Sequence, residues 1–338
     1  MKRIRQWRLK SHPQGMPVPD DWELCEVEAP VLRPGTVRAR ALLHDVAPYM
    51  RGRISGRANY AAGVAPGDVM VGGAIAVVEE STLDGFRPGD LIVSDFGFGW
   101  QEQAVLAPAD FRRVDLGIGP IECWLDVLGL NGVTAYFGLL HRGEMKAGDR
   151  VVVSAAAGSV GQLVGQIAAL AGGTPVALTS TWRKLAFCRE IGFADGIAYR
   201  EVVDVADALK ELCPNGVDVF FDNSAGPLHD AVMRNLAFGA RIVICGQVSL
   251  AGRFEEPDTG ERFLRQIMIA RANVCGFLAI DYADRYDEAR RRLGQWLSEG
   301  RIRTRYDIVD GFEKLPQALI GLFHSDNVGK RLVRTGDL

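Results

Sequence analysis

The segment that most constrains the fold runs from Val151 to Ala171 and reads VVVSAAAGSVGQLVGQIAALA. It begins with β-branched residues, passes through a turn of small residues and continues as an apolar stretch with helical spacing. A short apolar run of this kind is typical of a strand buried on both faces of a parallel sheet. The order of strand, small-residue turn and helix predicts the first βα unit of a dinucleotide-binding fold, with the ligand near residue 158.

The turn has the small residues that a bound diphosphate requires. Gly158 lets the backbone approach the diphosphate, and Gly161 lets the helix pack closely on the preceding strand. Ala156 occupies the position of the first glycine in a GxGxxG pattern, and such a pattern alone is a weak signal. The free N–H groups at the start of the helix should point at the phosphates. Plain close packing of strand and helix is the alternative interpretation.

The end of the next predicted strand, residues 175–179, indicates which dinucleotide is bound. A fold that prefers NAD usually has an acidic residue there, about 20 residues past the turn, to hold the ribose hydroxyls. This chain instead has Ser180 and Thr181, followed by Arg183 and Lys184. Hydroxyls and cations bind a 2′-phosphate, and cations at a helix N-terminus are disfavoured unless an anion compensates. The sequence therefore predicts NADP(H), the alternative being solvated cations in a first helical turn.

Residues before 150 predict a separate β domain. Short apolar or alternating runs are separated by turn sequences such as Arg33-Pro34-Gly35, which is typical of an antiparallel, barrel-like domain. The expected strands there are 37–43, 75–80, 91–95 and 103–106. A chain of 338 residues is long enough for two such domains.

After residue 151 the chain alternates between strand and helix patterns, as in a doubly wound α/β sheet. We expect strands over 217–221, 241–246 and 274–280, a helix over 228–238 that ends at Gly239, and a helix over 283–299 that ends at Gly300. Two further strands, 304–309 and 330–334, should return to the first domain. The predicted domains are residues 1–122, 123–303 and the returning segment 304–338.

Composition limits the partners and the compartment. A net charge of −3 gives no electrostatic footprint for nucleic acid. The six cysteines have no CxxC spacing and most lie in apolar runs, so we expect reduced thiols in a cytoplasmic protein. The N-terminal residues carry charges without an apolar signal region, and no apolar run reaches 18 residues. We therefore expect neither a nucleic-acid partner nor a membrane partner.

Seven sequence blocks along the chain carry a resemblance to a known family. They are Pro48–Arg53, Gly132–Leu140, Val151–Gln166, Phe221–Asn223, Ile244–Gln247, Asp281–Arg285 and Asn327–Lys330. In this order they resemble the zinc-independent branch of the medium-chain dehydrogenase/reductase family, which contains prostaglandin reductases, alkenal double-bond reductases and bacterial curcumin reductase. The resemblance covers nearly the whole chain. It implies a GroES-like β domain beside a Rossmann domain, and commonly a homodimer through a sheet edge, for which the apolar strand 240–248 is suited.

The sequence lacks the ligand pattern of a zinc site. A catalytic zinc needs three protein ligands and a structural zinc needs four. Zinc-using relatives have a Gly-His-Glu sequence where this chain has Gly67-Asp68-Val69. His44 with Asp45 is the candidate pair that remains, and we expect this histidine to be an ordinary core or surface residue. We predict no metal.

Without a Lewis acid, alcohol oxidation loses its usual stabilisation of an alkoxide, whereas reduction of a polarised C=C bond does not need a metal. The resemblance therefore implies NADPH-dependent reduction of α,β-unsaturated carbonyl compounds, with hydride transfer to the β-carbon. A quinone or carbonyl reductase on the same scaffold is one alternative. An NADP(H)-binding protein with little turnover is another.

Two departures from the family pattern affect the substrate side. The family commonly has a tyrosine just after the Cys-Gly-Gln block, where it donates a hydrogen bond to the substrate carbonyl. Here Leu250 stands at that place and cannot donate a hydrogen bond. The family also usually reads Val-Asp-Pro-Tyr-Met-Arg, whereas this chain has Ala47 in place of the acid.

Another donor is therefore required, because negative charge develops on the carbonyl oxygen after hydride transfer. Tyr49 is the first candidate, Tyr60 the second and Ser249 the third. The alternative for Tyr49 is a packed aromatic residue in a rigid Pro-Tyr-Met turn. A ribose hydroxyl of the cofactor is a further possible donor.

The resemblance also implies which residues contact the cofactor. The residues expected at the diphosphate are Gly158, Ser159, Val160 and Gly161. Those expected at the 2′-phosphate are Ser180, Thr181, Lys184 and Tyr199. Those expected along the ribose and nicotinamide are Thr134, Asn223, Cys245, Gly246, Phe277, Ala279 and Asn327.

Overall fold

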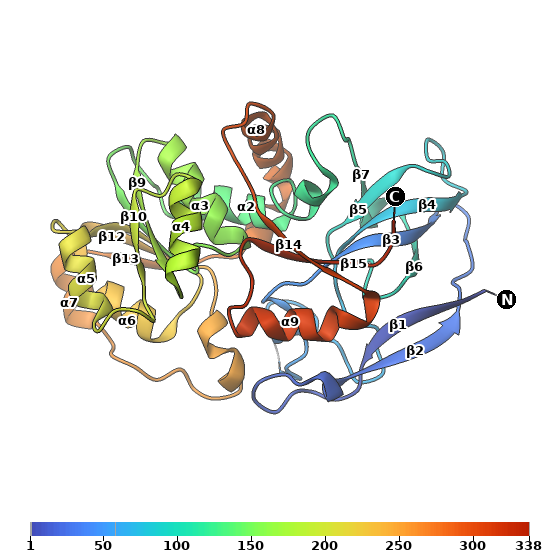
Figure 1. Ribbon diagram of the computed structural model, residues 1–338, viewed down its shortest axis with the longest axis horizontal. Helices are drawn as coiled ribbons and strands as arrows, with labels where there is room; N and C mark the ends of the chain where they lie inside the picture. The colour runs from blue at the N-terminus through green and yellow to red at the C-terminus, as the bar shows by residue number, and fades with distance from the viewer. Residues whose placement is uncertain (1, 58, 338) are drawn as a thin grey trace.

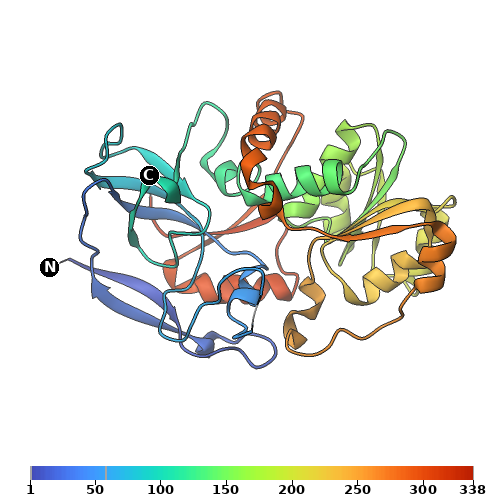
Figure 2. The same cartoon turned by 180° about the vertical axis from the view of Figure 1, so that it is seen from behind.

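The computed structural model describes residues 2–57 and 59–337. The chain forms two lobes side by side, and helix α9 (Leu315–Phe323) lies with strands β14 (Tyr306–Asp310) and β15 (Lys330–Arg334) on the β-rich side of the junction (Figure 1). The same arrangement is seen from behind in Figure 2. Among the described residues, no helix is both long enough and apolar enough to cross a membrane.

The β-rich lobe is built on a mixed sheet whose described strands follow the order β14-β15-β3-β4-β5-β7, with β6 paired to β3. The N-terminal strands of this lobe are β1 (Arg3–Leu9), β2 (Trp22–Glu28), β3 (Val37–Asp45), β4 (Ala74–Ser81), β5 (Leu91–Ser94), β6 (Gln103–Leu106) and β7 (Arg112–Arg113). The four strands predicted in this part of the chain are present as β3 to β6. The two predicted C-terminal strands do return here, because β15 pairs with β3.

The second lobe contains a parallel sheet whose described strands follow the order β10-β9-β8-β11-β12-β13. Its strands are β8 (Arg150–Ser154), β9 (Thr174–Thr179), β10 (Asp195–Ala198), β11 (Val217–Asp222), β12 (Leu236–Ile244) and β13 (Asn273–Gly276). In chain order this is 3-2-1-4-5-6, the doubly wound arrangement in which a ligand binds where the strand order reverses. The predicted α/β class is therefore confirmed, and the reversal lies between β8 and β11.

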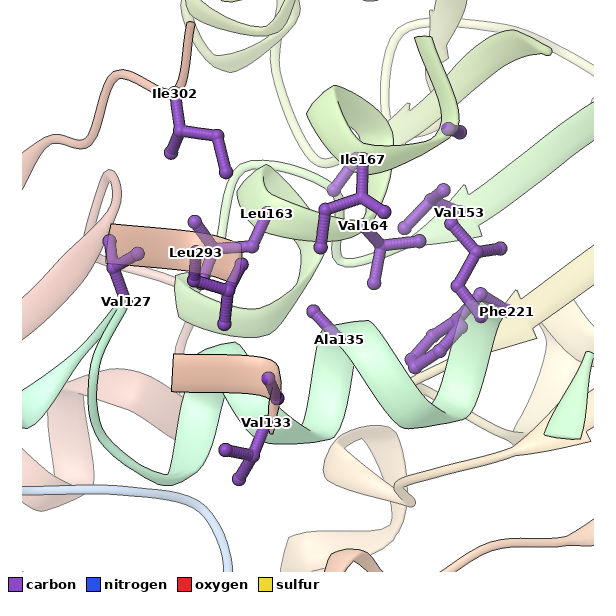
Figure 3. Packing of buried hydrophobic residues seen from close by; sticks show 14 of the residues in the cluster. Val127, Val133, Ala135, Val153, Leu163, Val164, Ile167, Phe221, Leu293 and Ile302 are labelled. Carbon is purple, nitrogen blue, oxygen red and sulfur yellow. The ribbon is translucent and has the colours of Figure 1, made fainter. Parts of the chain in front are cut away.

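Helices cover both faces of the parallel sheet. They are α2 (Leu130–Tyr136), α3 (Ser159–Leu170), α4 (Trp182–Glu190), α5 (Val205–Leu212), α6 (Gly226–Met233), α7 (Leu264–Ala270) and α8 (Tyr286–Ser298), while the short α1 (Met50–Arg53) belongs to the β-rich lobe. Figure 3 shows Val164 of α3 and Ala135 of α2 packed beside Val153 and Phe221 of the sheet. Helices α5 and α6 pack on the opposite face. This burial fixes the start of α3 against the sheet edge.

Two predicted elements of this lobe are wrong in their bounds. The helix expected over 228–238 ends at Met233, and β12 already begins at Leu236. The residues after the helix join the sheet because the Val217 N–H donates to the Asn235 carbonyl (2.8 Å), so Gly239 is a strand residue with φ of +74° rather than a helix end. The strand expected over 274–280 ends at Gly276.

The expectation that strand 240–248 lies at the sheet edge, where it could form a dimer, is also wrong. Strand β12 covers most of residues 240–248, and it pairs with β11 on one side and with β13 on the other. Its backbone groups are therefore already used within the sheet. The edge strand on this side is β13.

Candidate active site

The cofactor residues expected from the sequence gather along one edge of the parallel sheet. Most of them directly follow a strand: 158–161 come after β8, 180–184 after β9, Tyr199 after β10, Asn223 after β11, 245–246 after β12, and 277–279 after β13. Thr134 lies on α2, and Asn327 lies in the loop between α9 and β15. Because the carboxyl ends of parallel strands share one edge, the structure brings these segments to the crevice where the strand order reverses.

The turn after β8 can hold a diphosphate. Ala155 adopts a φ of +49°, and the Gly158 N–H donates to the Ala155 carbonyl (2.9 Å). Gly158 is the N-cap of α3 and has no side chain that could cap the helix. The N–H groups of the first turn are therefore left for an anion. The loop before β15 lies against this turn, since the Gly329 N–H donates to the Ala157 carbonyl (2.7 Å).

Gly161 is required by the close approach of α3 to this turn. A Cβ at this position would lie 2.4 Å from the Ala155 carbonyl oxygen and 2.7 Å from Ala156 Cα, both of which are backbone atoms. We expect Gly161→Ala to lower the free energy of unfolding by about 2 kcal/mol, because the helix must move away from the strand. Chemical denaturation measures this change. Gly276→Ala is the control, because a Cβ there would meet no atom within 4 Å and the loss of unfolding free energy should be far smaller. Gly148→Ala is unsuitable as a control because Gly148 has a positive φ.

Lys184 is buried beside a set of neutral oxygen atoms. Its backbone N–H donates to the Thr181 hydroxyl (3.4 Å), and its Nζ donates to the carbonyl oxygen (2.6 Å) and hydroxyl (2.9 Å) of Ser325. Burial and the nearby Arg200 guanidinium lower the pKa of Lys184 to about 8. The Ser180 hydroxyl also contacts the Ser325 hydroxyl (3.2 Å). A phosphate is the kind of group that this cation and these hydroxyls can bind.

Asn223, Cys245 and Gly246 follow the carboxyl ends of β11 and β12. The N–H groups of Cys245 and Gly246 donate to the Asp222 carbonyl oxygen (2.8 and 3.0 Å). A Cβ on Gly246 would lie 2.9 Å from the Asn223 carbonyl oxygen, so glycine permits this close approach. Burial raises the pKa of the Cys245 thiol to about 12. Cys245 is thus a neutral thiol near pH 7 and a poor nucleophile.

The three candidate donors differ in what their hydroxyls contact. The Tyr49 hydroxyl is buried without a hydrogen-bond partner among the described residues, and its ring packs edge-on against Phe96 (5.6 Å between centroids). Tyr60 is 56% exposed. The Ser249 hydroxyl already donates to the Ser224 carbonyl (2.6 Å). Tyr49 is therefore the candidate whose proton is free within a buried site.

Tyr49 and Tyr60 both have perturbed hydroxyl groups. Burial raises the pKa of Tyr49 well above its usual value, and the neighbouring Asp45 and Tyr60 contribute in the same direction. Burial likewise raises the pKa of Tyr60, with a smaller contribution from Cys245. Tyr49 therefore stays protonated at neutral pH. Leu250 is buried and 6% exposed.

Arg51 is a residue of this region that the sequence did not assign. Its side chain is 2% exposed, and its Nε donates to the Ala251 carbonyl (2.9 Å). Its Nη2 donates to Glu255 (2.6 Å) and to the Gly15 carbonyl (2.9 Å). Arg51 therefore ties the Tyr49 loop to the segment that follows β12. Ala251 and Glu255 lie 200 and 204 positions from Arg51 in the sequence, so no spacing in the sequence indicates these contacts.

His44 is a core residue. Its Nε2 contacts the Gln101 carbonyl oxygen (3.1 Å) and its Nδ1 contacts the Thr335 hydroxyl (3.2 Å). Burial lowers the pKa of His44 to about 4, so the ring is neutral. The adjacent Asp45 forms a buried ion pair with Lys330. Within residues 2–57 and 59–337, no group of three or more histidine, cysteine, aspartate or glutamate side chains could hold a metal ion.

Comparison with known proteins identifies the family. Residues 5–114 match the family model described as "N-terminal domain of oxidoreductase". Residues 159–295 match the family model described as "Zinc-binding dehydrogenase". The NADPH-dependent curcumin reductase of Escherichia coli is 37% identical to the chain, covering 98% of this chain and 97% of that protein. The chain belongs to the medium-chain dehydrogenase/reductase family. Bovine prostaglandin reductase 1 is 34% identical, covering 99% of this chain and all of that protein.

Solved structures of this dehydrogenase/reductase family agree with the fold. CurA from Vibrio vulnificus, solved in complex with NADPH, is 36% identical to this chain and superimposes on it with a TM-score of 0.91. The match covers 99% of this chain and 100% of the CurA chain. The resemblance to the zinc-independent branch of the family is thereby confirmed. The chain is an NADP-dependent oxidoreductase, and its cofactor is NADP(H).

Proposed function

We propose that the protein reduces the C=C bond of α,β-unsaturated carbonyl compounds with NADPH and without zinc. The observation that carries this proposal is the buried Tyr49 hydroxyl, which has no partner among the described residues and lies by the junction of the lobes. A buried hydroxyl without a partner is costly unless a ligand satisfies it. The names of the curcumin and prostaglandin reductases support the same class of reaction.

The proposed cofactor contacts follow from the sheet edge. The first-turn N–H groups of α3 would hold the diphosphate, and Lys184 with Ser180 and Thr181 would hold the 2′-phosphate. The backbone around Asn223 and Cys245 would hold the nicotinamide half. The remaining proposed contacts are Tyr199 at the 2′-phosphate side, and Thr134, Gly246, Phe277, Ala279 and Asn327 along the ribose and nicotinamide.

The protein's part in the reaction is to hold the substrate and donate a hydrogen bond to its carbonyl oxygen. NADPH supplies a hydride to the β-carbon, and negative charge then develops on the carbonyl oxygen. Tyr49 donates a hydrogen bond to this oxygen, since its raised pKa keeps the hydroxyl protonated. The α-carbon of the resulting enolate then takes a proton from water, which leaves hydroxide to be neutralised by solvent and completes the saturated carbonyl product. Phe96 and Leu250 offer apolar surface for the rest of the substrate.

Product analysis tests the proposed reaction. The enzyme is incubated with NADPH and 4-phenyl-3-buten-2-one, and the product is identified by NMR. We expect the saturated ketone, because the carbonyl group is polarised but not reduced. Formation of the allylic alcohol would instead indicate a carbonyl reductase, and turnover restricted to quinones would indicate a quinone reductase. Absence of NADPH oxidation with any electrophile would favour a binding protein.

We propose a homodimer formed through β13, the exposed edge of the parallel sheet. Exposed apolar side chains surround this edge, including Phe238 (77% exposed), Leu264 (69%) and Met268 (68%). An edge strand whose outer side has no partner strand, and which is flanked by apolar surface, favours pairing with a second copy. We expect Phe238→Asp combined with Met268→Glu to convert the dimer to a monomer, measured by light scattering after size exclusion. Val203→Asp is the matched control, because Val203 is fully exposed and precedes α5. A wild-type monomer would contradict the proposal.

A further inference from the structure

Asp222, the last residue of β11, is a fully buried acid that the proposed reaction does not use. Its Oδ1 accepts hydrogen bonds from the Ser154 hydroxyl (2.9 Å) and from the N–H groups of Ser224 (2.9 Å) and Ala225 (3.0 Å). Its Oδ2 lies 2.9 Å from His229 Nδ1. A buried carboxylate is stable only when its oxygens are satisfied in this way. Each of these partners therefore affects how firmly Asp222 is held.

Asp222 organises the backbone on the nicotinamide side of the crevice. The Asn223 N–H donates to the Ser154 hydroxyl (2.8 Å), and Asn223 Nδ2 donates to the Ser154 carbonyl (2.8 Å), so the end of β11 is fixed to the end of β8. The N–H groups of Cys245 and Gly246 donate to the Asp222 carbonyl oxygen. Asp222 thus holds Cys245 and Gly246 directly and Asn223 through the Ser154 hydroxyl, and we place the cofactor at these three positions.

The turn that Asp222 holds is strained. Ala225 has φ of +59° and ψ of −165°, a conformation that is unfavourable for a residue with a Cβ. Its N–H is held by Asp222 Oδ1, and the Ser224 carbonyl accepts hydrogen bonds from both the N–H (3.1 Å) and the hydroxyl (2.6 Å) of Ser249. The strained conformation persists only while these bonds hold it. Loss of the Asp222 anchor would therefore release the turn and the segment beyond β12.

His229 provides the charge that balances Asp222. It lies on α6, its side chain is 22% exposed, and the charged groups around it are Asp222 on β11, Asp230 on α6 and Asp258 in the segment before α7. Burial by itself would lower the pKa of His229, but its hydrogen bond to Asp222 and the charges of the three acids raise the pKa above the usual value. The imidazolium thus persists to a higher pH than in an exposed histidine.

We propose that His229 is a positioning residue for the nicotinamide half of NADP(H), acting by anchoring the side chain of Asp222. The Asp222 carboxylate holds Ser224 and Ala225, and the backbone carbonyl of the same residue holds Cys245 and Gly246. The inference rests on the proposed placement of the nicotinamide beside Asn223 and Cys245, and it does not depend on the identity of the substrate. Without the histidine, Asp222 keeps a buried negative charge with one oxygen unpaired. The carboxylate then takes up a proton or turns, and the 223–225 turn relaxes.

The test compares two ligands on two variants and one control. NADPH occupies the whole site, whereas adenosine 2′,5′-bisphosphate carries the adenine half and the 2′-phosphate but no nicotinamide. Their affinities are measured by calorimetry between pH 6 and pH 9 for the wild type, His229→Leu, His229→Asn and Asp230→Asn. We expect His229→Leu to weaken NADPH binding about tenfold, the equivalent of about 1.4 kcal/mol, and to leave bisphosphate binding within about twofold. His229→Asn keeps an N–H donor and should restore NADPH binding to within about threefold.

The pH dependence gives a readout that does not need the leucine variant to fold. Because the pKa of His229 is raised, wild-type affinity for NADPH should be full at low pH and should decline as pH rises through that pKa. His229→Asn should lack this decline, while Asp230→Asn should keep it. Lys184 also titrates, and the bisphosphate reports its contribution separately.

Several outcomes would overturn the inference. These are an unchanged NADPH affinity in His229→Leu, an equal loss for both ligands, or a pH profile of His229→Asn identical to that of the wild type. The binding measurements use no enone. A protein that binds NADPH as expected but reduces no enone would therefore contradict the proposed function and leave the role of His229 standing.

Discussion

Replacing Lys184 with alanine should raise the KM for NADPH about 30-fold, the equivalent of about 2 kcal/mol, and change the KM for NADH less than about threefold. Lys184 Nζ is buried and bonded to the neutral oxygens of Ser325, so a 2′-phosphate would be its anionic partner. NADH lacks that phosphate, so its binding does not depend on the charge of Lys184. Initial rates with each nucleotide, at saturating electrophile, give the two KM values.

The control for this prediction is Lys210→Ala, because Lys210 is an exposed lysine on α5 that pairs with Asp207. Its loss should leave both KM values unchanged. Equal increases for NADPH and NADH in Lys184→Ala would contradict the assignment. The pKa of Lys184 is about 8, so the wild-type preference for NADPH should weaken as pH rises above 8 and the lysine loses its charge. That pH dependence should be absent in Lys184→Ala.

Removing the hydroxyl of Tyr49 should lower kcat for enone reduction about 100-fold, with little change in the KM for NADPH. The hydroxyl is the proposed donor to the substrate oxygen, whereas the ring keeps its packing against Phe96 in Tyr49→Phe. The free energy of unfolding should stay the same or rise, because the hydroxyl has no partner among the described residues. Stopped-flow measurement of NADPH oxidation in a single turnover tests the kinetic effect.

Tyr60→Phe is the matched comparison for Tyr49→Phe. Tyr60 is 56% exposed, so water can replace its hydroxyl, and we expect a loss of about threefold or less. A wild-type rate in Tyr49→Phe would rule out its hydroxyl as the donor and would direct attention to a ribose hydroxyl of the cofactor. A larger loss in Tyr60→Phe than in Tyr49→Phe would reverse the proposed roles.

The parts of the fold that could be predicted are those with local physical causes. The segment from Val151 to Ala171 contains its strand, its turn and its helix in one continuous pattern, and β8 and α3 form there. The predicted helix over 228–238 has the wrong end because the last residues of that range fit either a helix or a strand. The decision came from pairing with β11, a contact that the local pattern does not contain. The hairpin of β1 and β2 was not predicted, because charged residues interrupt its alternation.

The same distinction applies to the candidate site. Positions at the ends of parallel strands could be named from the sequence, because the topology brings those ends together. The side chains that support these positions could not be named from the sequence. His229 reaches Asp222 only because α6 begins after a strained turn, and Arg51 reaches Glu255 only because the two lobes meet. Leu250 and Ala47 remain the positions where the family pattern and this chain differ, and among the three candidate donors Tyr49 has the buried hydroxyl without a partner.

The placement of β15 has a consequence for how the protein is made. This strand lies between β14 and β3 and ends at Arg334, close to the end of the chain. The first sheet therefore cannot be completed during synthesis until residues 330–334 have left the ribosome, although β3 is made much earlier. The same segment carries Gly329 and Lys330, which contact the glycine turn and Asp45. A chain that lacks residues 329–334 therefore loses β15 and, with it, the contacts that Gly329 and Lys330 make to the glycine turn and to Asp45.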